Sequence, residues 1–254
     1  MFTRPSLLAL LFLVSPLCGD EPESSLDVYL LIGQSNMAGR AELSESDLVE
    51  ITGASLFNGD GEWEPAKNPL NRYSTIRKDI KMQRMGPGYG FAESMRTLCP
   101  DRPIGLVVNA KGGSSVAEWH PDELFFQDAV SRTRAALKTP GATLKGILWH
   151  QGEADVSNSH YLEQLAHLVA ELRRQINSPT VPFVAGQLFA PDDQQARIGF
   201  NSRLTTIGEF IPRSGYAGSE LLTAFDKAHF DAPSMRLLGL RYAERMVALQ
   251  RQPE

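Results

Sequence analysis

Four short apolar runs constrain the fold of this chain more than any other feature of its sequence. They span residues 26–32, 104–109, 144–150 and 181–188. The first run stops at Gly33, and runs of this length are typical of strands that are buried on both faces of a parallel sheet. The segments between the runs repeat their apolar residues at helical spacing, most clearly over residues 123–137 and 161–176.

Strand and helix therefore alternate, and this order predicts an α/β protein whose parallel sheet carries helices on both faces. Pro233 is placed to begin a last amphipathic helix over residues 234–249. Residues 42–86 show little periodicity and predict a long excursion over the strand ends rather than a second domain. We expect residues 20–254 to form one domain, because a chain of this length with 42% hydrophobic residues can bury a full core.

The N-terminus has the residue order of a secretory signal peptide. Arg4 provides positive charge, residues 7–17 are apolar, and Cys18-Gly19 precede two acidic residues. The apolar run is shorter than the roughly 20 residues that span a bilayer, so export is favoured over a membrane anchor. We predict that residues 1–19 are a signal peptide and that the protein is secreted or periplasmic, with lipidation at Cys18 as the minor alternative.

Charge and residue spacing argue against several kinds of partner. The formal net charge of −5 provides no positive field for a phosphate backbone or an anionic membrane surface. The histidines at 120, 150 and 229 lack the His-x-x-x-His spacing of a zinc site, and no paired-cysteine motif is present. We therefore expect no metal, no cofactor, no nucleic-acid partner and no stable membrane insertion.

Residues that can carry chemistry follow three of the predicted strands. Ser35 lies in residues 33–39, directly after the first strand, and a glycine pair lies in residues 110–115, after the second. Residues 149–155, after the third strand, bring an imidazole, an amide and carboxylates into one turn. Because the carboxyl ends of parallel strands meet at one edge of the sheet, we expect these segments to lie close together.

A fourth segment, Asp-Lys-Ala-His at residues 226–229, precedes the last helix. Its Asp-x-x-His spacing lets the carboxylate hold one imidazole nitrogen while the other faces a nucleophile. Each segment taken alone also has a simpler interpretation. Ser35 could be a helix cap, the glycine pair could be a flexible loop, and a single Asp-x-x-His pair is weakly specific.

Taken together, four motifs in this order resemble the sialate O-acetylesterase-like branch of the SGNH hydrolase superfamily, which includes carbohydrate esterase family 6. They are Gly33-Gln34-Ser35-Asn36-Met37, Gly112-Gly113, His150-Gln151-Gly152-Glu153 and Asp226-x-x-His229. The resemblance spans nearly the whole chain after the predicted signal peptide. It implies a three-layer α/β/α sandwich with a central parallel sheet, the flavodoxin-like SGNH hydrolase fold.

The resemblance also implies catalytic roles. Ser35 is expected to be the nucleophile and His229 its general base. Asp226 is ranked first as the carboxylate that orients His229, and Glu153 is ranked second. Residues 86–91 resemble a further segment of the branch and are expected to form a wall of the pocket.

An oxyanion hole and a substrate site are implied as well. The backbone N–H groups of Ser35 and Gly113 and the side-chain amide of Gln151 are expected to meet the oxyanion. Gln151 stands where the wider superfamily has an Asn. Four further residues are expected to contact substrate, and Trp119 among them could stack on a sugar ring. They are Gln34, Asn36, Trp119 and His150.

The implied activity is hydrolysis of O-acetyl groups from an acetylated carbohydrate, such as acetylxylan or acetylated sialic acid, through an acetyl-enzyme. Two alternatives remain at this point. One is an SGNH hydrolase that acts on another acyl ester, and the other is a carbohydrate-binding relative that has lost the reaction. The identity of the sugar and the oligomeric state are not determined by the sequence.

Overall fold

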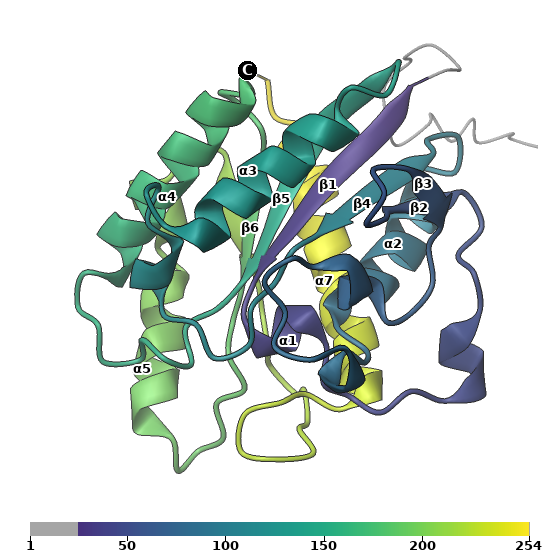
Figure 1. The fold of residues 1–254 in the computed structure, drawn as a ribbon. Helices are drawn as coiled ribbons and strands as arrows, with labels where there is room; N and C mark the ends of the chain where they lie inside the picture. Colours follow the sequence, from purple (N-terminus) through teal and green to yellow (C-terminus); the bar gives the residue numbers. More distant parts are fainter. Residues whose placement is uncertain (1–24, 254) are drawn as a thin grey trace, which may run out of the picture.

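In the computed structural model, which describes residues 25–253, the strands form a seven-stranded sheet between two layers of helices (Figure 1). The strand order is β3-β2-β4-β1-β5-β6-β7, and every neighbouring pair is parallel except β2 with β3. The strands are β1 Leu26–Gly33, β2 Ala54–Phe57, β3 Trp63–Pro65, β4 Ile104–Val108, β5 Ala142–His150, β6 Phe183–Gly186 and β7 Ser214–Ala217. The predicted signal peptide, residues 1–19, lies outside the described residues.

The predicted fold class is confirmed, since all four predicted strands and the three predicted helices form near the expected positions. The α-helices are α1 Ser35–Ala38, α2 Pro87–Leu98, α3 Leu124–Ala136, α4 Tyr161–Ile176, α5 Gln195–Leu204, α6 Ile207–Phe210 and α7 Ala232–Gln250. Short 3-10 helices span Glu45–Leu48, Leu70–Tyr73, Ile80–Met82 and Val116–Trp119. Without β2 and β3, the parallel strands have the order of a flavodoxin-like sheet. The strand that follows β1, β4, lies on one side of it, and β5, β6 and β7 are added on its other side.

The excursion over residues 42–86 is more structured than predicted. It contains β2 and β3, which form a hairpin that extends the sheet beyond β4. Strands of four and three residues are too short to show the period of two that identifies a strand in a sequence. Residues 86–91 also differ from the prediction, because Gly86 caps α2 and Pro87 begins it, so the expected wall loop is the first turn of a helix.

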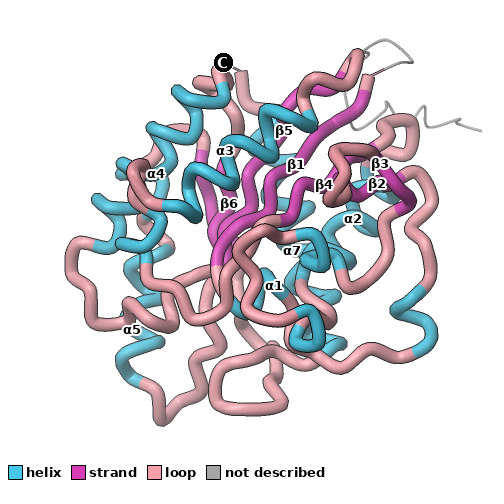
Figure 2. Tube along the Cα trace, viewed as in Figure 1, coloured by secondary structure: helices cyan, strands magenta, loops and turns pink. Residues whose placement is uncertain are grey.

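Two hydrophobic layers hold the helices to the sheet, and β1 contributes to both. Tyr29 and Leu31 pack with α2 and α7 on one face, and Val28, Leu30 and Ile32 pack with α3, α4 and α5 on the other. This alternation follows from the opposite directions of successive side chains along a strand. Figure 2 shows the loops gathered around α1, where β1 ends. The core therefore presents the carboxyl ends of the strands to these loops.

Helices α2 and α7 cross at glycines. A Cβ atom on Gly239 would lie 2.4 Å from the backbone nitrogen of Phe91, and one on Gly90 would lie 2.6 Å from the Arg236 carbonyl oxygen. These contacts are closer than real Cβ contacts and involve backbone, which cannot turn away. The two helices therefore pack as closely as they do because both positions lack a side chain.

We expect Gly239→Ala to lower the free energy of unfolding by about 1–3 kcal/mol, because the added methyl group overpacks this crossing. Urea unfolding measures the change. Gly199→Ala is the matched control, since Gly199 lies in α5 and a Cβ atom there would meet nothing within 4 Å. The control should be neutral or stabilising by up to about 1 kcal/mol, and equal losses in both variants would contradict the overpacking argument.

Candidate active site

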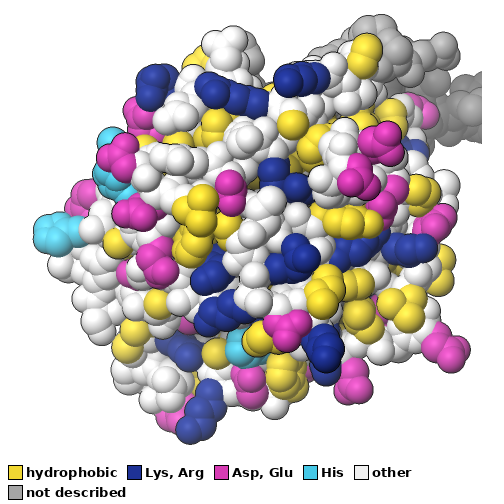
Figure 3. All heavy atoms as spheres, in the orientation of Figure 1, with side chains coloured by type: hydrophobic (Ala, Val, Ile, Leu, Met, Phe, Trp, Pro, Cys, Tyr) yellow, Lys and Arg dark blue, Asp and Glu magenta, His cyan; other side chains and the backbone are white. Residues whose placement is uncertain are grey.

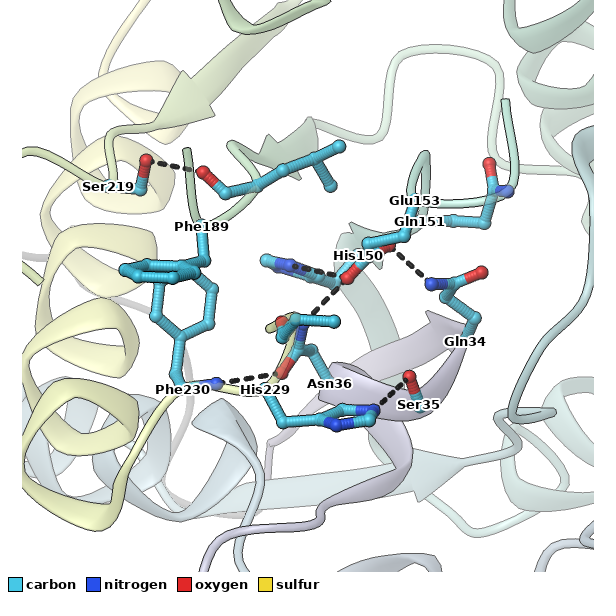
Figure 4. Close-up of polar contacts among 12 residues, drawn as sticks. Gln34, Ser35, Asn36, His150, Gln151, Glu153, Phe189, Ser219, His229 and Phe230 are labelled. Carbon is cyan, nitrogen blue, oxygen red and sulfur yellow. Dashed lines mark hydrogen bonds and ion pairs between the residues drawn. The ribbon is translucent and has the colours of Figure 1, made fainter. Parts of the chain in front are cut away.

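The motifs singled out in the sequence converge at the carboxyl ends of the central strands. Ser35 follows β1, the glycine pair follows β4, and Gln151 and Glu153 follow β5. His229 arrives from the loop before α7 and lies against Ser35 (Figure 4). The residues that were predicted to react are therefore neighbours in space, although up to 194 positions separate them in the sequence.

The turn that carries Ser35 depends on Gly33. This glycine has φ +131°, and a Cβ atom on it would lie 2.2 Å from the His150 carbonyl oxygen. The next residue, Gln34, donates its backbone N–H to the same oxygen at 2.8 Å. Ser35 then begins α1, so its hydroxyl leaves the sheet at the start of a helix, beside the end of β5.

Ser35 and His229 form a direct hydrogen bond. His229 Nε2 lies 2.9 Å from Ser35 Oγ, and His229 Nδ1 lies 2.7 Å from Asp226 Oδ2. A carboxylate only accepts hydrogen bonds, so Nδ1 carries the proton and Nε2 presents its lone pair to the serine hydroxyl. The imidazole is thus in the tautomer that can take a proton from Ser35.

Asp226 is held by its own turn. Its Oδ1 accepts the backbone N–H groups of Ala228 at 2.8 Å and His229 at 2.7 Å, while Oδ2 faces the imidazole. Burial works to raise the pKa of Asp226, but the hydrogen bonds from the His229 side chain and from these backbone N–H groups outweigh it and hold the pKa below its usual value. The carboxylate that faces His229 is therefore ionised at neutral pH.

Glu153 has different partners from those expected. Its carboxylate accepts the side-chain amides of Gln34 and of Asn36, the latter at 2.6 Å, and no hydrogen bond joins it to His229 within residues 25–253. Burial raises the pKa of Glu153, against the opposing effects of its hydrogen bonds. Asp226, which was ranked first, is thus the carboxylate that touches His229, and Glu153 is not.

His150, beneath this carboxylate, is a neutral imidazole. Burial lowers its pKa to about 3. Tyr242 donates its hydroxyl proton to the Trp149 carbonyl at 2.7 Å, so the 3.1 Å contact between that hydroxyl and His150 Nδ1 is donated by the imidazole. His150 Nε2 lies 3.9 Å from Glu153 Oε1 and has no hydrogen-bond partner among the described residues.

Backbone N–H groups are available beside Ser35. A Cβ atom on Gly112 would lie 3.7 Å from Ser35 Cβ, so the turn after β4 adjoins the serine directly. Gly113, the next residue, has φ +74°, which favours glycine. In the turns and loops that the structure describes, the backbone N–H groups of Ser35 and Gly113 donate no hydrogen bond, so both can meet an oxyanion.

The side-chain amide of Gln151, unlike these two backbone N–H groups, already donates hydrogen bonds within the protein. Its nitrogen donates to the Ser114 carbonyl at 3.0 Å and to Asp155 Oδ2 at 2.5 Å. Both neighbours only accept, so both N–H bonds are directed at them and neither faces Ser35. This corrects the prediction that the Gln151 side chain donates to the oxyanion. Instead it holds Ser114, the residue after Gly113. The sequence placed Asp155 in the same turn but did not indicate that it would bind the Gln151 amide.

The four residues predicted to contact substrate are buried. Trp119, His150 and Asn36 are 0% exposed and Gln34 is 3% exposed. Trp119 donates its indole N–H to Ser114 Oγ and packs edge-on against Trp149. Side chains without exposed surface cannot contact a ligand, so the prediction is wrong in this structure for Trp119, His150 and Asn36, whereas for Gln34 it stays a prediction. The sequence marks them as polar or aromatic near a strand end but does not show which way each one points.

Other residues border the site that sequence analysis did not single out. The Arg40 guanidinium would lie 2.5 Å from a Cβ atom on Gly112, and Lys78 Nζ would lie 3.3 Å from one on Gly113. The exposed ring of Phe225 stacks on His229, with centroids 5.8 Å apart and ring planes 17° apart. Arg40 follows the serine motif and Phe225 precedes Asp226, so their places in the sequence could have suggested them.

Among residues 25–253, no cluster of three or more His, Cys, Asp or Glu side chains could hold a metal ion. Over the same residues, no helix combines the length and apolar character needed to cross a bilayer.

Comparison with known proteins gives a consistent family match. Residues 25–248 match the family model described as carbohydrate esterase, sialic acid-specific acetylesterase. A probable carbohydrate esterase from Arabidopsis thaliana is 30% identical over 178 residues, which are 62% of this chain and 66% of that protein. A probable 9-O-acetyl-N-acetylneuraminic acid deacetylase from Escherichia coli K12 is 42% identical over 134 residues, 44% of this chain and 38% of that protein. The chain thus covers less than two thirds of either relative.

Solved structures show the same fold. The Arabidopsis thaliana protein aligns with a TM-score of 0.77 at 23% identity, over 88% of this chain and 98% of that one. NanS aligns with a TM-score of 0.70 at 18% identity, over 90% of this chain and 98% of that one. At these identities the likeness establishes the architecture, and the chemistry has to be argued from the residues of this chain.

The buried Glu153 predicts a pH dependence of stability. Its pKa is raised in the folded protein, so the folded state holds that proton more tightly than the unfolded chain does. The resulting stabilisation is complete below the unfolded pKa and is lost as pH rises through the folded pKa. We therefore expect the native protein to lose stability relative to Glu153→Gln as pH rises above about 4, the usual pKa of an unfolded glutamate.

Urea unfolding of both proteins over this pH series is the measurement. Glu171→Gln is the control of opposite sign, because a hydrogen bond from Arg174 lowers the pKa of the Glu171 carboxyl. The native protein should lose stability relative to that variant as pH falls, not as it rises. Parallel stability curves for the native protein and Glu153→Gln would refute the raised pKa.

Proposed function

The chain belongs to the carbohydrate esterase, sialic acid-specific acetylesterase family, and from this premise we propose that it hydrolyses O-acetyl esters of carbohydrates, with Ser35 as nucleophile and His229 as base. One observation carries the proposal. It is the continuous chain of hydrogen bonds from Asp226 through His229 to Ser35, with contacts of 2.7 and 2.9 Å. This is the arrangement that activates a serine hydroxyl toward an acyl group.

Acylation begins with proton transfer from Ser35 Oγ to His229 Nε2 as Oγ attacks the acetyl carbonyl carbon. A bond forms between Oγ and that carbon, and the carbonyl electrons move to oxygen. Collapse of the tetrahedral species breaks the bond to the sugar oxygen, which takes the proton back from His229. The sugar leaves with its hydroxyl restored, and Ser35 carries the acetyl group.

Deacylation repeats the steps with water in place of Ser35. His229 takes a proton from the water as its oxygen attacks the acetyl carbon, and then returns the proton to Ser35 Oγ as acetate leaves. Asp226 stabilises the imidazolium that forms in each half-reaction. The Ser35 and Gly113 N–H groups stabilise the oxyanion, and Gln151 contributes by holding the Gly113 turn through Ser114.

Cations beside Ser35 favour an acetylated sugar that carries an anionic group. Arg40 binds the Gly39 and Met82 carbonyls at 2.6 and 3.0 Å through Nη1, and within residues 25–253 neither Arg40 nor Lys78 forms a salt bridge. Figure 3 shows Lys and Arg side chains gathered across this face, although the net charge of the chain is −5. A partly buried guanidinium without a carboxylate partner gains most from an anion supplied by the ligand.

Export remains part of the proposal. It is supported by the charged, apolar and small-residue order of residues 1–19. N-terminal sequencing of the protein isolated from its host tests it, and an uncleaved Met1 in a cytoplasmic fraction would count against it.

For the reaction itself, we expect Ser35→Ala to abolish acetate release from an acetylated sugar and from an aryl acetate. Asp226→Asn should keep the fold but lower kcat by at least about 10²-fold, because the imidazole loses the carboxylate that orients it. The control is Ser131→Ala, an exposed serine of α3, which should keep native activity. Native protein without activity on any acetyl ester would refute the function, and full activity in Asp226→Asn would refute the role of Asp226.

For substrate charge, we expect a higher kcat/KM on mono-O-acetylated glucuronic acid or glucose 6-sulfate than on mono-O-acetylated glucose. Arg40→Met should remove about tenfold or more of that preference, since it removes a charge-assisted hydrogen bond. Lys138→Met is the control and should keep the preference, because Lys138 is exposed and lies between the end of α3 and the start of β5, away from the carboxyl ends of the strands.

A further inference from the structure

Asn36 connects the serine element to the histidine loop. It follows Ser35 in α1 and is fully buried. Its Nδ2 donates to the Ala228 carbonyl at 3.0 Å, and its Oδ1 accepts the Phe230 backbone N–H at 3.3 Å. Ala228 and Phe230 are the two neighbours of His229 in the chain, so one side chain holds the backbone on both sides of the base (Figure 4).

Glu153 holds the Asn36 amide in this orientation. The second hydrogen of Asn36 Nδ2 is donated to Glu153 Oε1 at 2.6 Å, and Gln34 donates to the other carboxylate oxygen. The Ala228 carbonyl and the Glu153 carboxylate only accept, so the amide nitrogen has to face them and Oδ1 has to face the Phe230 N–H. Reversing the amide would lose all three contacts of Asn36.

The loop that carries His229 has few other attachments to the serine side of the site. Leu221 and Phe225 in this loop are exposed, and the Phe225 N–H bonds to the His229 carbonyl within the loop itself. Arg197 holds the Lys227 carbonyl, but it comes from α5 and not from α1. Among the described hydrogen bonds, only those of Asn36 and the Ser35–His229 contact join α1 to residues 226–230.

We propose, on the basis of the proposed serine mechanism, that Asn36 is a positioning residue that sets the separation of Ser35 Oγ and His229 Nε2, and that Glu153 acts on the reaction through Asn36. Neither side chain touches substrate or the reacting atoms. Proton transfer requires a heavy-atom separation of about 2.6–3.2 Å, and a displacement of about 1 Å can cost about 10²-fold in rate. A clamp on both neighbours of His229 protects that separation.

The test compares Asn36→Ala with Asn201→Ala. Asn201 is a matched control, since its buried amide also clamps one backbone position from both sides, donating to the Leu188 carbonyl and accepting the Leu188 N–H, both at 2.8 Å. Each variant should lower the melting temperature, because each loses buried hydrogen bonds. Asn36→Ala should lower kcat on an aryl acetate by about 10²-fold with KM changed by less than about twofold. Asn201→Ala should keep kcat within about threefold.

Variants of Glu153 provide a second, independent measurement. Glu153→Gln keeps an oxygen that can accept from Asn36 and should retain more kcat than Glu153→Ala. Because Glu153 acts through Asn36, kcat of the Asn36→Ala/Glu153→Ala double variant should be no lower than that of Asn36→Ala alone. The comparison of Glu153→Gln with Glu153→Ala does not involve an Asn36 variant, so it still tests the proposal if Asn36→Ala is poorly folded.

Three outcomes would overturn the proposal. They are native kcat in folded Asn36→Ala, an equal loss of kcat in Asn201→Ala, and equal kcat in Glu153→Gln and Glu153→Ala. A rise in KM at constant kcat would show substrate contact instead of positioning. Loss of activity in Ser35→Ala but not in Asn36→Ala would leave the serine mechanism standing and remove only this inference, whereas an inactive native protein would refute the serine mechanism itself.

Discussion

The geometry of the site depends on how closely the end of β1 lies against the end of β5. Gly33 pairs with His150, and any side chain at Gly33 would meet the His150 carbonyl. That contact determines the point at which the chain leaves the sheet, so Ser35 emerges beside the turn that carries Glu153. A residue with a Cβ atom would push the two strand ends apart and move the serine away from its partners.

A buried polar layer beneath Ser35 transmits this arrangement to the histidine. Burial keeps His150 neutral and raises the pKa of Glu153, and the Asn36 amide there has a defined direction because reversing it would leave buried donors and acceptors unpaired. Tyr242 of α7 bonds the Trp149 carbonyl of β5. Since α7 begins just after His229, the base is attached to the sheet through the helix that follows it and through Asn36.

Residues near a strand end proved easier to place than to orient. Ser35 and His229 could be assigned because a motif names the residue type and its chemistry together. Trp119 and Asn36 could not, because a residue in a helix of a single turn points inward or outward according to packing that no local pattern records. Gln151 shows the same limit, since its amide is available or occupied depending on Asp155 and Ser114, which only the folded turn brings together.

By itself the sequence determined the order of strands β1, β4, β5 and β6 and of helices α3, α4 and α7, because the periods of buried strands and amphipathic helices can be read within a dozen residues. It also predicted that Ser35 and His229 act as a pair, and the structure places the two side chains within hydrogen-bond distance. The tertiary structure alone decided that Asp226 and not Glu153 touches His229, that Arg40 lies against Gly112 and that Lys78 lies against Gly113. Those outcomes depend on distances between segments far apart in the chain, and such distances exist only once the core has brought the segments together.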